Sequence, residues 1–107
     1  MNGLYKAQFQ TPFGSGSAVF VLRDGHLRGG NGALYYVGNY RLDGETFSAT
    51  LKTDRHTHDL TTASVFGMDK LNVTLEGVVN GNTITFDGVA NEVPDMQVQG
   101  MLERLCD

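Results

Sequence analysis

The residues of this sequence that could ligate a metal ion are gathered in one short polar stretch, with Asp54, His56, His58 and Asp59 close together. On an extended segment His56 and His58 lie on the same face, and neutral imidazoles beside a carboxylate can bind zinc. The spacing fixes no third ligand, however, and histidines two residues apart on a polar connection are more typical of a solvated segment. We therefore predict no metal site and no cofactor, with His56 and His58 as the only weak candidates.

Two other features could carry chemistry. Cys106 is the only cysteine, but it is the penultimate residue, where chains fray, and a reactive thiol needs a fixed, electropositive environment. The glycine-rich run Gly29-Gly30-Asn31-Gly32 is followed by neither the Lys-Ser or Lys-Thr pair nor the helix that a phosphate-binding loop requires. Neither feature predicts catalysis, and we expect a protein that is not an enzyme.

Composition narrows the possible partners. The net charge is −4, and the eight Lys and Arg residues are scattered without a basic run, which argues against binding to nucleic acid. The N-terminus lacks the pattern of a secretion signal, and no stretch approaches the roughly 20 apolar residues that span a bilayer. With a single cysteine no internal disulfide can form. We expect one domain over residues 1–107, located in the cytoplasm and in contact with neither nucleic acids nor a membrane.

The elements that must position these residues are short strands. The chain has 14 Gly, only 2 Pro and no window with several turns of amphipathic helix. Its clearest hairpin lies in the stretch Gly29 to Leu51, where apolar residues alternate from Leu34 onward and again after an Asp43-Gly44 turn. Gly38 in the middle of a strand suggests a bend or a close backbone approach of the kind that curls a sheet into a barrel.

Turn signals divide the rest of the chain into strands. Asp24-Gly25, Asp43-Gly44 and Asn80-Gly81 are the strongest, and we expect each to form a type I′ turn between antiparallel neighbours. Residues 53–67 read as one long connection that could contain a helical turn, and the last strand is expected at residues 97–105. The pattern predicts an all-β, eight-stranded antiparallel up-and-down barrel, because closure removes exposed edges. A two-sheet β-sandwich with the same meander is the alternative.

Two strands are apolar on both faces. Val19 and Val21 alternate with Phe20 and Leu22, and Tyr35 and Val37 alternate with Leu34 and Tyr36. One face of each strand must therefore be apolar outside the barrel. We predict that Val19, Val21, Tyr35 and Val37 form the interface of a homodimer.

The inward aromatic residues leave two possibilities open. Tyr36, Tyr40, Phe47 and Phe86 could fill the interior as core, or they could line a cavity for a small apolar ligand. A ligand carrier needs a cavity of about 300 Å³ or more. A filled barrel with an apolar outer face would instead indicate a protein-binding module.

The order and spacing of several motifs resemble the GrlR-like family, the negative regulators of type III secretion in enteropathogenic bacteria. The similarity extends from about Gly3 to Phe66 and includes the following motifs: Gly3-Leu4-Tyr5, the Gly14 to Val21 strand, Asp24-Gly25, Gly29-Gly30, Tyr36 to Tyr40, and Asp43-Gly44. The resemblance implies a small lipocalin-like barrel that dimerises and restrains a transcriptional activator by binding it, without touching DNA.

The chain differs from the family pattern at two places. Family members are often acidic directly after the paired glycines, where this chain has Asn31. The best-known member carries four acidic residues in the hairpin turn, where this chain has Leu42-Asp43-Gly44-Glu45. The resemblance implies that Asp43, Gly44 and Glu45 contact the protein partner.

Overall fold

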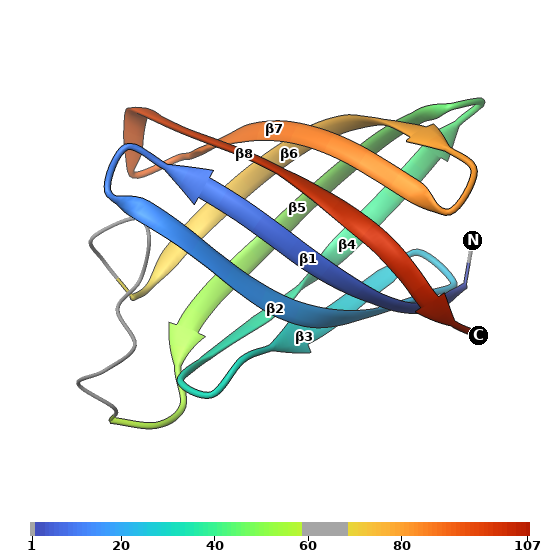
Figure 1. The fold of residues 1–107 in the computed structure, drawn as a ribbon. Helices are drawn as coiled ribbons and strands as arrows, with labels where there is room; N and C mark the ends of the chain where they lie inside the picture. Colours follow the sequence, from blue (N-terminus) through green and yellow to red (C-terminus); the bar gives the residue numbers. More distant parts are fainter. Residues whose placement is uncertain (1, 59–68) are drawn as a thin grey trace.

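The structure, a computed structural model, describes residues 2–58 and 69–107, which form a closed barrel of eight antiparallel strands (Figure 1). The strands are β1 (Gly3–Thr11), β2 (Gly14–Arg23), β3 (His26–Gly30), β4 (Leu34–Asp43), β5 (Thr46–Arg55), β6 (Leu71–Asn80), β7 (Thr83–Ala90) and β8 (Val93–Cys106). Each strand pairs with the next along the chain, and β8 returns to pair with β1. The predicted all-β, lipocalin-like up-and-down barrel is therefore confirmed, and the sandwich alternative is wrong.

Two predicted boundaries are corrected. β5 continues to Arg55, so residues 53–55 belong to a strand and not to the polar connection. β8 begins at Val93, ahead of the predicted start at residue 97, because Met96 continues the inward alternation of Val98 and Leu102. Pro94 and Asp95 hide this continuation in the sequence, since both are poor strand residues. The helical turn considered for the connection falls at residues 59–68, outside the described residues.

The core is the inside of the barrel. Alternate residues of every strand point inward, and the side chains of Leu22, Phe47 and Ile84 are almost completely buried. Aromatic rings meet there: the rings of Phe20 and Tyr36 lie 5.2 Å apart, centroid to centroid. The interior is thus filled by interlocking side chains, as in other small barrels.

Gly38 allows β4 and β5 to approach closely. A Cβ atom at Gly38 would lie 2.0 Å from the backbone oxygen of Thr50 and 2.7 Å from the Cα of Leu51. These are backbone atoms of the paired strand, so no side-chain movement could make room. The position accounts for the glycine in mid-strand and confirms the second of the two predicted reasons for it, a close backbone approach.

The hairpin turns are of two kinds, which corrects the prediction that all three are type I′. Asp24 and Gly25 both have positive φ, 52° and 84°, as a type I′ turn requires. At the other two hairpins only the first loop residue has positive φ, Gly44 at 63° and Gly81 at 64°, as in type II′ turns. The reason is register: Asp43 pairs with Thr46 and ends a strand, so the loop is Gly44-Glu45.

The two ends of the barrel differ. The termini and the β2–β3, β4–β5 and β6–β7 turns lie at one end, on the right of Figure 1. The β1–β2, β3–β4 and β7–β8 turns lie at the other end, together with the start of the β5–β6 connection. The described residues include no helix that is long and apolar enough to cross a membrane.

Candidate functional site

The outer surface of β2, β3 and β4 carries an apolar patch, which we define as Val19, Val21, Tyr35 and Val37. The exposed fractions of Val19, Val21 and Tyr35 are 45%, 40% and 42%, and Val37 is half-buried. Their sequence neighbours Phe20, Leu22, Leu34 and Tyr36 are buried in the core. The structure thus places all four predicted interface residues outside the barrel.

Strand pairing makes the patch continuous. Val21 pairs with Arg28, which pairs in turn with Val37. In the neighbouring row Val19 pairs with Gly30, which pairs with Tyr35. Directly paired residues of antiparallel strands point to the same side, so the short strand β3 joins the two apolar strands into one surface. This bridging role of β3 could not be read from the sequence, because it depends on the register of three strands.

Arg28 lies in the middle of the patch. Its side chain is exposed, and its one hydrogen bond within the described residues is the donation from Nη1 to the backbone oxygen of Leu27, at 3.2 Å. It forms no ion pair with a described residue. A guanidinium with free donors on an apolar surface can fix the orientation of a binding partner, because each donor needs an acceptor once water is removed.

The acidic turn Asp43-Gly44-Glu45 lies at the other end of β4 from Tyr35. All three residues are exposed, and neither carboxylate is part of an ion pair within the described residues. The turn is a protruding hairpin tip, as predicted, and it is separated from the apolar patch along the strand. The structure therefore offers two distinct surfaces for contact.

The residues considered for a ligand cavity divide into two groups. Tyr36 and Phe86 line an apolar cavity of about 40 Å³, which is also lined by Thr53. Phe47 and Tyr40 lie outside that cavity and pack edge to face, with ring centroids 5.9 Å apart. A drug-sized ligand needs about 300 Å³ or more, so among the described residues the interior is filled in this conformation.

Among the described residues, Tyr36 is one of two buried tyrosines of this interior, the other being Tyr5. Burial raises the pKa of the Tyr36 hydroxyl to about 12, and a hydrogen bond with the Asn31 side chain opposes that rise. The phenol is therefore neutral at physiological pH. A buried, hydrogen-bonded neutral tyrosine acts as a packing residue and is poorly suited to acid–base catalysis.

Asn31 fixes the β3–β4 loop. Its Oδ1 accepts hydrogen bonds from the backbone nitrogens of Ala33 and Leu34, at 3.0 and 2.9 Å, and its Nδ2 donates to the backbone oxygen of Ser17 at 3.1 Å. An aspartate could accept the first two bonds but could not donate the third. The amide at position 31 therefore has a structural role that a carboxylate could not fill completely.

Among the described residues, His56 and His58 are not grouped into a metal site, and Asp59 lies outside the described residues. Both ring nitrogens of His56 are engaged, Nε2 with the backbone oxygen of Asn31 at 2.8 Å and Nδ1 with Oγ1 of Thr57 at 2.6 Å. His58 is exposed. Within residues 2–58 and 69–107 no three His, Cys, Asp or Glu side chains are grouped as metal ligands. His56 serves to hold the end of β5 against the β3–β4 loop.

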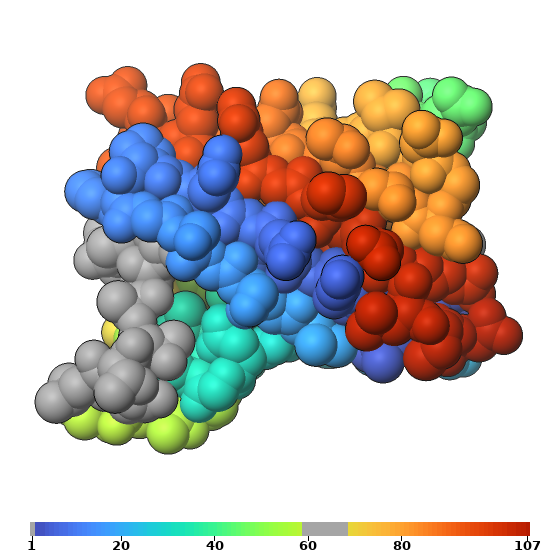
Figure 2. Space-filling view, viewed as in Figure 1, coloured from blue at the N-terminus to red at the C-terminus, as the bar shows by residue number. Residues whose placement is uncertain are grey.

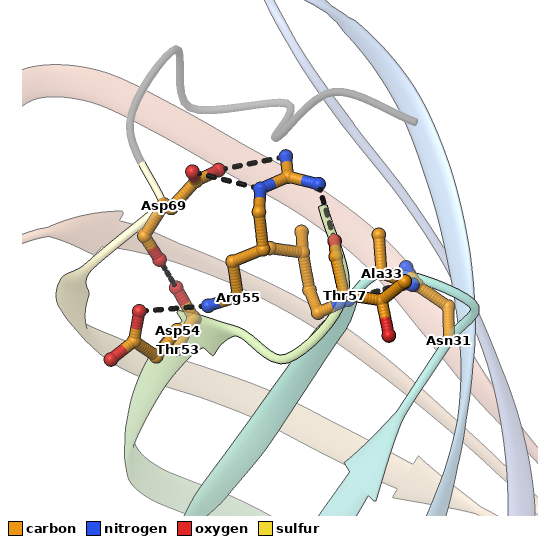
Figure 3. A network of polar contacts seen from close by, with 8 residues as sticks. Asn31, Ala33, Thr53, Asp54, Arg55, Thr57 and Asp69 are labelled. Atoms are coloured by element: carbon orange, nitrogen blue, oxygen red, sulfur yellow. Dashed lines mark hydrogen bonds and ion pairs between the residues drawn. The ribbon is translucent and has the colours of Figure 1, made fainter. Parts of the chain in front are cut away.

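Sequence reasoning missed an ion pair at this end of the barrel (Figure 3). Arg55 donates from Nε and Nη2 to the two carboxylate oxygens of Asp69, at 2.9 and 3.0 Å, and Thr53 donates from Oγ1 to the Asp69 backbone oxygen at 2.6 Å. The pair joins the end of β5 to the residues before β6. No sequence signal marks it, because its partners are separated by the β5–β6 connection.

This ion pair predicts a pH dependence of stability. Hydrogen bonding from Arg55 holds the pKa of Asp69 below its usual range. Since the folded-state pKa is the lower one, the pair stabilises the fold at neutral pH, and that stability is lost as the pH falls through the folded pKa. Replacing Asp69 with Asn should cost about 1 kcal/mol or less at pH 7, because the pair is partly exposed.

Urea unfolding of parent and Asp69→Asn at several pH values measures this effect. The difference in the free energy of unfolding between parent and Asp69→Asn should become smaller as the pH falls. The control is Asp95→Asn, which removes an exposed carboxylate that has no ion pair among the described residues. A gap of constant size down to pH 2 would contradict an electrostatic role for Asp69.

In comparisons with known proteins, no family model and no curated protein matched this chain. The relation to the GrlR-like family therefore stays a prediction that rests on the motifs quoted above.

Proposed function

We propose that this protein is a non-enzymatic regulator that acts by binding other proteins and that works as a homodimer. The observation that carries the proposal is the outer apolar patch of β2–β4, formed by residues whose neighbours fill the core. Exposed apolar surface of this kind is typical of protein interfaces. The small interior cavity supports a binding module over a carrier of apolar ligands.

The resemblance to the GrlR-like family suggests what such a regulator binds. On this proposal the protein restrains a transcriptional activator in the cytoplasm, as a negative regulator of type III secretion. The exposed turn Asp43-Gly44-Glu45 would then contact basic residues of the activator. The separation of this turn from the apolar patch supports a division of roles, with one surface for the second subunit and one for the activator.

The homodimer gives the first test. Replacing Val21 with Lys should convert the dimer into a folded monomer, because a charge would be buried in the interface without disturbing the core. The matched control is Val78→Lys, since Val78 is an exposed valine, 56% accessible, on the outer surface of β6. Val37→Lys should behave like Val21→Lys.

Sedimentation velocity at tens of micromolar, with circular dichroism to verify folding, measures the outcome. Parent protein and Val78→Lys should sediment as dimers, and both patch variants as monomers. A monomeric parent, or a Val21→Lys variant that dimerises like the parent, would contradict the proposed interface.

The acidic turn gives a second test. Reversing both charges with Asp43→Lys and Glu45→Lys should leave stability within about 0.5 kcal/mol of the parent, because exposed charges contribute little. Binding to the activator should weaken, chiefly through slower association, and should lose its salt dependence. The control is Asp87→Lys with Asp95→Lys, which makes the same change in net charge at other exposed positions.

Surface plasmon resonance with a purified activator over a range of salt concentrations measures both rates. Association of the control should keep the salt dependence of the parent. If the turn variant associates as fast and with the same salt dependence, the turn is not the recognition element, although the dimer test would be unaffected.

A further inference from the structure

The register of the barrel arranges the outer face around the patch in two parallel rows. One row reads Leu4, Val21, Arg28, Val37 and Lys52 across β1 to β5. The second row reads Lys6, Val19, Gly30, Tyr35 and Asp54 across the same strands. Figure 2 shows part of this outer surface over β1 and β2.

The two rows complement each other on β2 to β5, whereas on β1 Leu4 of the first row matches Lys6 of the second, which forms neither an apolar nor an ionic pair. On β2 and β4 an apolar residue of one row matches an apolar residue of the other, Val21 with Val19 and Val37 with Tyr35. On β3 the long side chain of Arg28 matches Gly30, which has no side chain. On β5 a cation matches an anion, since the first row ends in Lys52 and the second in Asp54. Complementarity of shape and charge within one surface is what a two-fold symmetric interface requires.

We infer that two copies of the chain pack face to face about a two-fold axis that crosses β2–β4 between these rows. This arrangement rests on the proposed homodimer and specifies its geometry. The axis places the first row against the partner's second row and the second row against the partner's first, with the strands of the two copies antiparallel. Arg28 then lies over the partner's Gly30, and Lys52 faces the partner's Asp54.

A two-fold axis along β3 is the competing arrangement. It would pair Val21 with the partner's Val37, but it would also place Arg28 against the partner's Arg28 and Gly30 against the partner's Gly30. The first contact buries like charges and the second leaves a gap, and both weaken an interface. The crossing axis avoids both defects.

The crossing axis also gives the guanidinium of Arg28 a contact in the partner. The guanidinium donates to Leu27 alone within the described residues. Over the partner's Gly30 it reaches the side of the partner's Tyr35, whose ring face attracts a cation. Tyr35 is 42% exposed and is available for this contact.

Charge exchange on β5 tests the orientation. Lys52→Glu alone should weaken dimerisation about tenfold, because two attractive contacts per dimer become repulsive. Asp54→Lys alone should weaken it by a similar factor. The double variant, which exchanges the two charges, should recover the parent dissociation constant to within about threefold. Glu76→Lys, on the outer surface of β6, is the control and should leave dimerisation unchanged.

Disulfide trapping provides an independent measurement. In a Cys106→Ser background, Val19→Cys is mixed with a size-tagged Val21→Cys chain under oxidising conditions. The crossing axis predicts that the disulfide forms between the two different chains, with little product from either chain alone. The axis along β3 predicts instead a product from Val21→Cys mixed with Val37→Cys.

The outcomes separate the orientation from the homodimer itself. The crossing axis is supported if the double variant recovers the parent dissociation constant and the disulfide forms between Val19→Cys and Val21→Cys. The orientation is wrong if the double variant dimerises more weakly than both single variants, or if the disulfide forms between Val21→Cys and Val37→Cys. Either result leaves the homodimer itself intact. A parent protein that is monomeric at tens of micromolar overturns both.

Discussion

Replacing Gly38 with Ala is expected to destabilise the barrel by about 3 kcal/mol or more, as for overpacking at a site that cannot relax. The added Cβ would lie 2.0 Å from the Thr50 oxygen, and both strands would have to separate to admit it. Small domains are stable by only about 5–15 kcal/mol, so this is a large fraction of the total. Urea unfolding followed by circular dichroism measures the change.

The matched control for Gly38 is Gly32→Ala in the β3–β4 loop. A Cβ at Gly32 meets no atom within 4 Å. The φ angle of Gly32 is not positive, so an alanine there is not strained. Its replacement should therefore be neutral, or stabilising by up to about 1 kcal/mol through the unfolded state. Equal unfolding midpoints for the two variants would mean that β4 and β5 do not approach each other closely at Gly38.

Replacing Phe47 with Ala is expected to cost about 3–5 kcal/mol, the usual range for a buried aromatic residue. The side chain is 1% exposed and packs against Tyr40 inside the barrel. Its loss removes apolar burial and leaves a void in a closed structure, where neighbouring strands cannot easily collapse. The unfolding midpoint in urea should fall with little change in slope.

Phe13→Ala is the control for Phe47, because it removes the same side chain from an exposed turn. Phe13 is 67% exposed in the β1–β2 turn. Its loss should change stability by less than about 0.5 kcal/mol. A Phe47 variant as stable as the Phe13 variant would show that the interior is loosely filled, and it would reopen the carrier alternative.

Alternation in the sequence was enough to predict much of this fold. The expected number of strands and their order agree with the structure, because half-buried strands repeat with a period of two residues whatever their neighbours are. The same period predicted that Val19, Val21, Tyr35 and Val37 point away from Phe20 and Tyr36. The predicted strand boundaries were wrong where polar residues at the end of β5 or Pro94 in β8 interrupt the pattern.

Register was decided by tertiary structure. An Asp-Gly pair predicts a tight turn, but whether Asp43 enters the loop or ends the strand depends on which residues pair across it. The structure pairs Asp43 with Thr46, which makes Gly44 the first loop residue and changes the turn type. Local sequence specifies that the chain turns, and the pairing of Leu42 with Phe47 and of Asp43 with Thr46 determines which residues form the loop.

The candidate site shows the same division. The sequence by itself determined which residues are apolar and on which side of their strand they lie, since side chains alternate strictly along a strand. The register of the barrel aligned Arg28 and Gly30 of β3 with the apolar residues of β2 and β4. The tertiary structure also brought Arg55 and Asp69 together in an ion pair. Such contacts depend on pairing between distant segments, and pairing is a property of the whole sheet that no single strand contains.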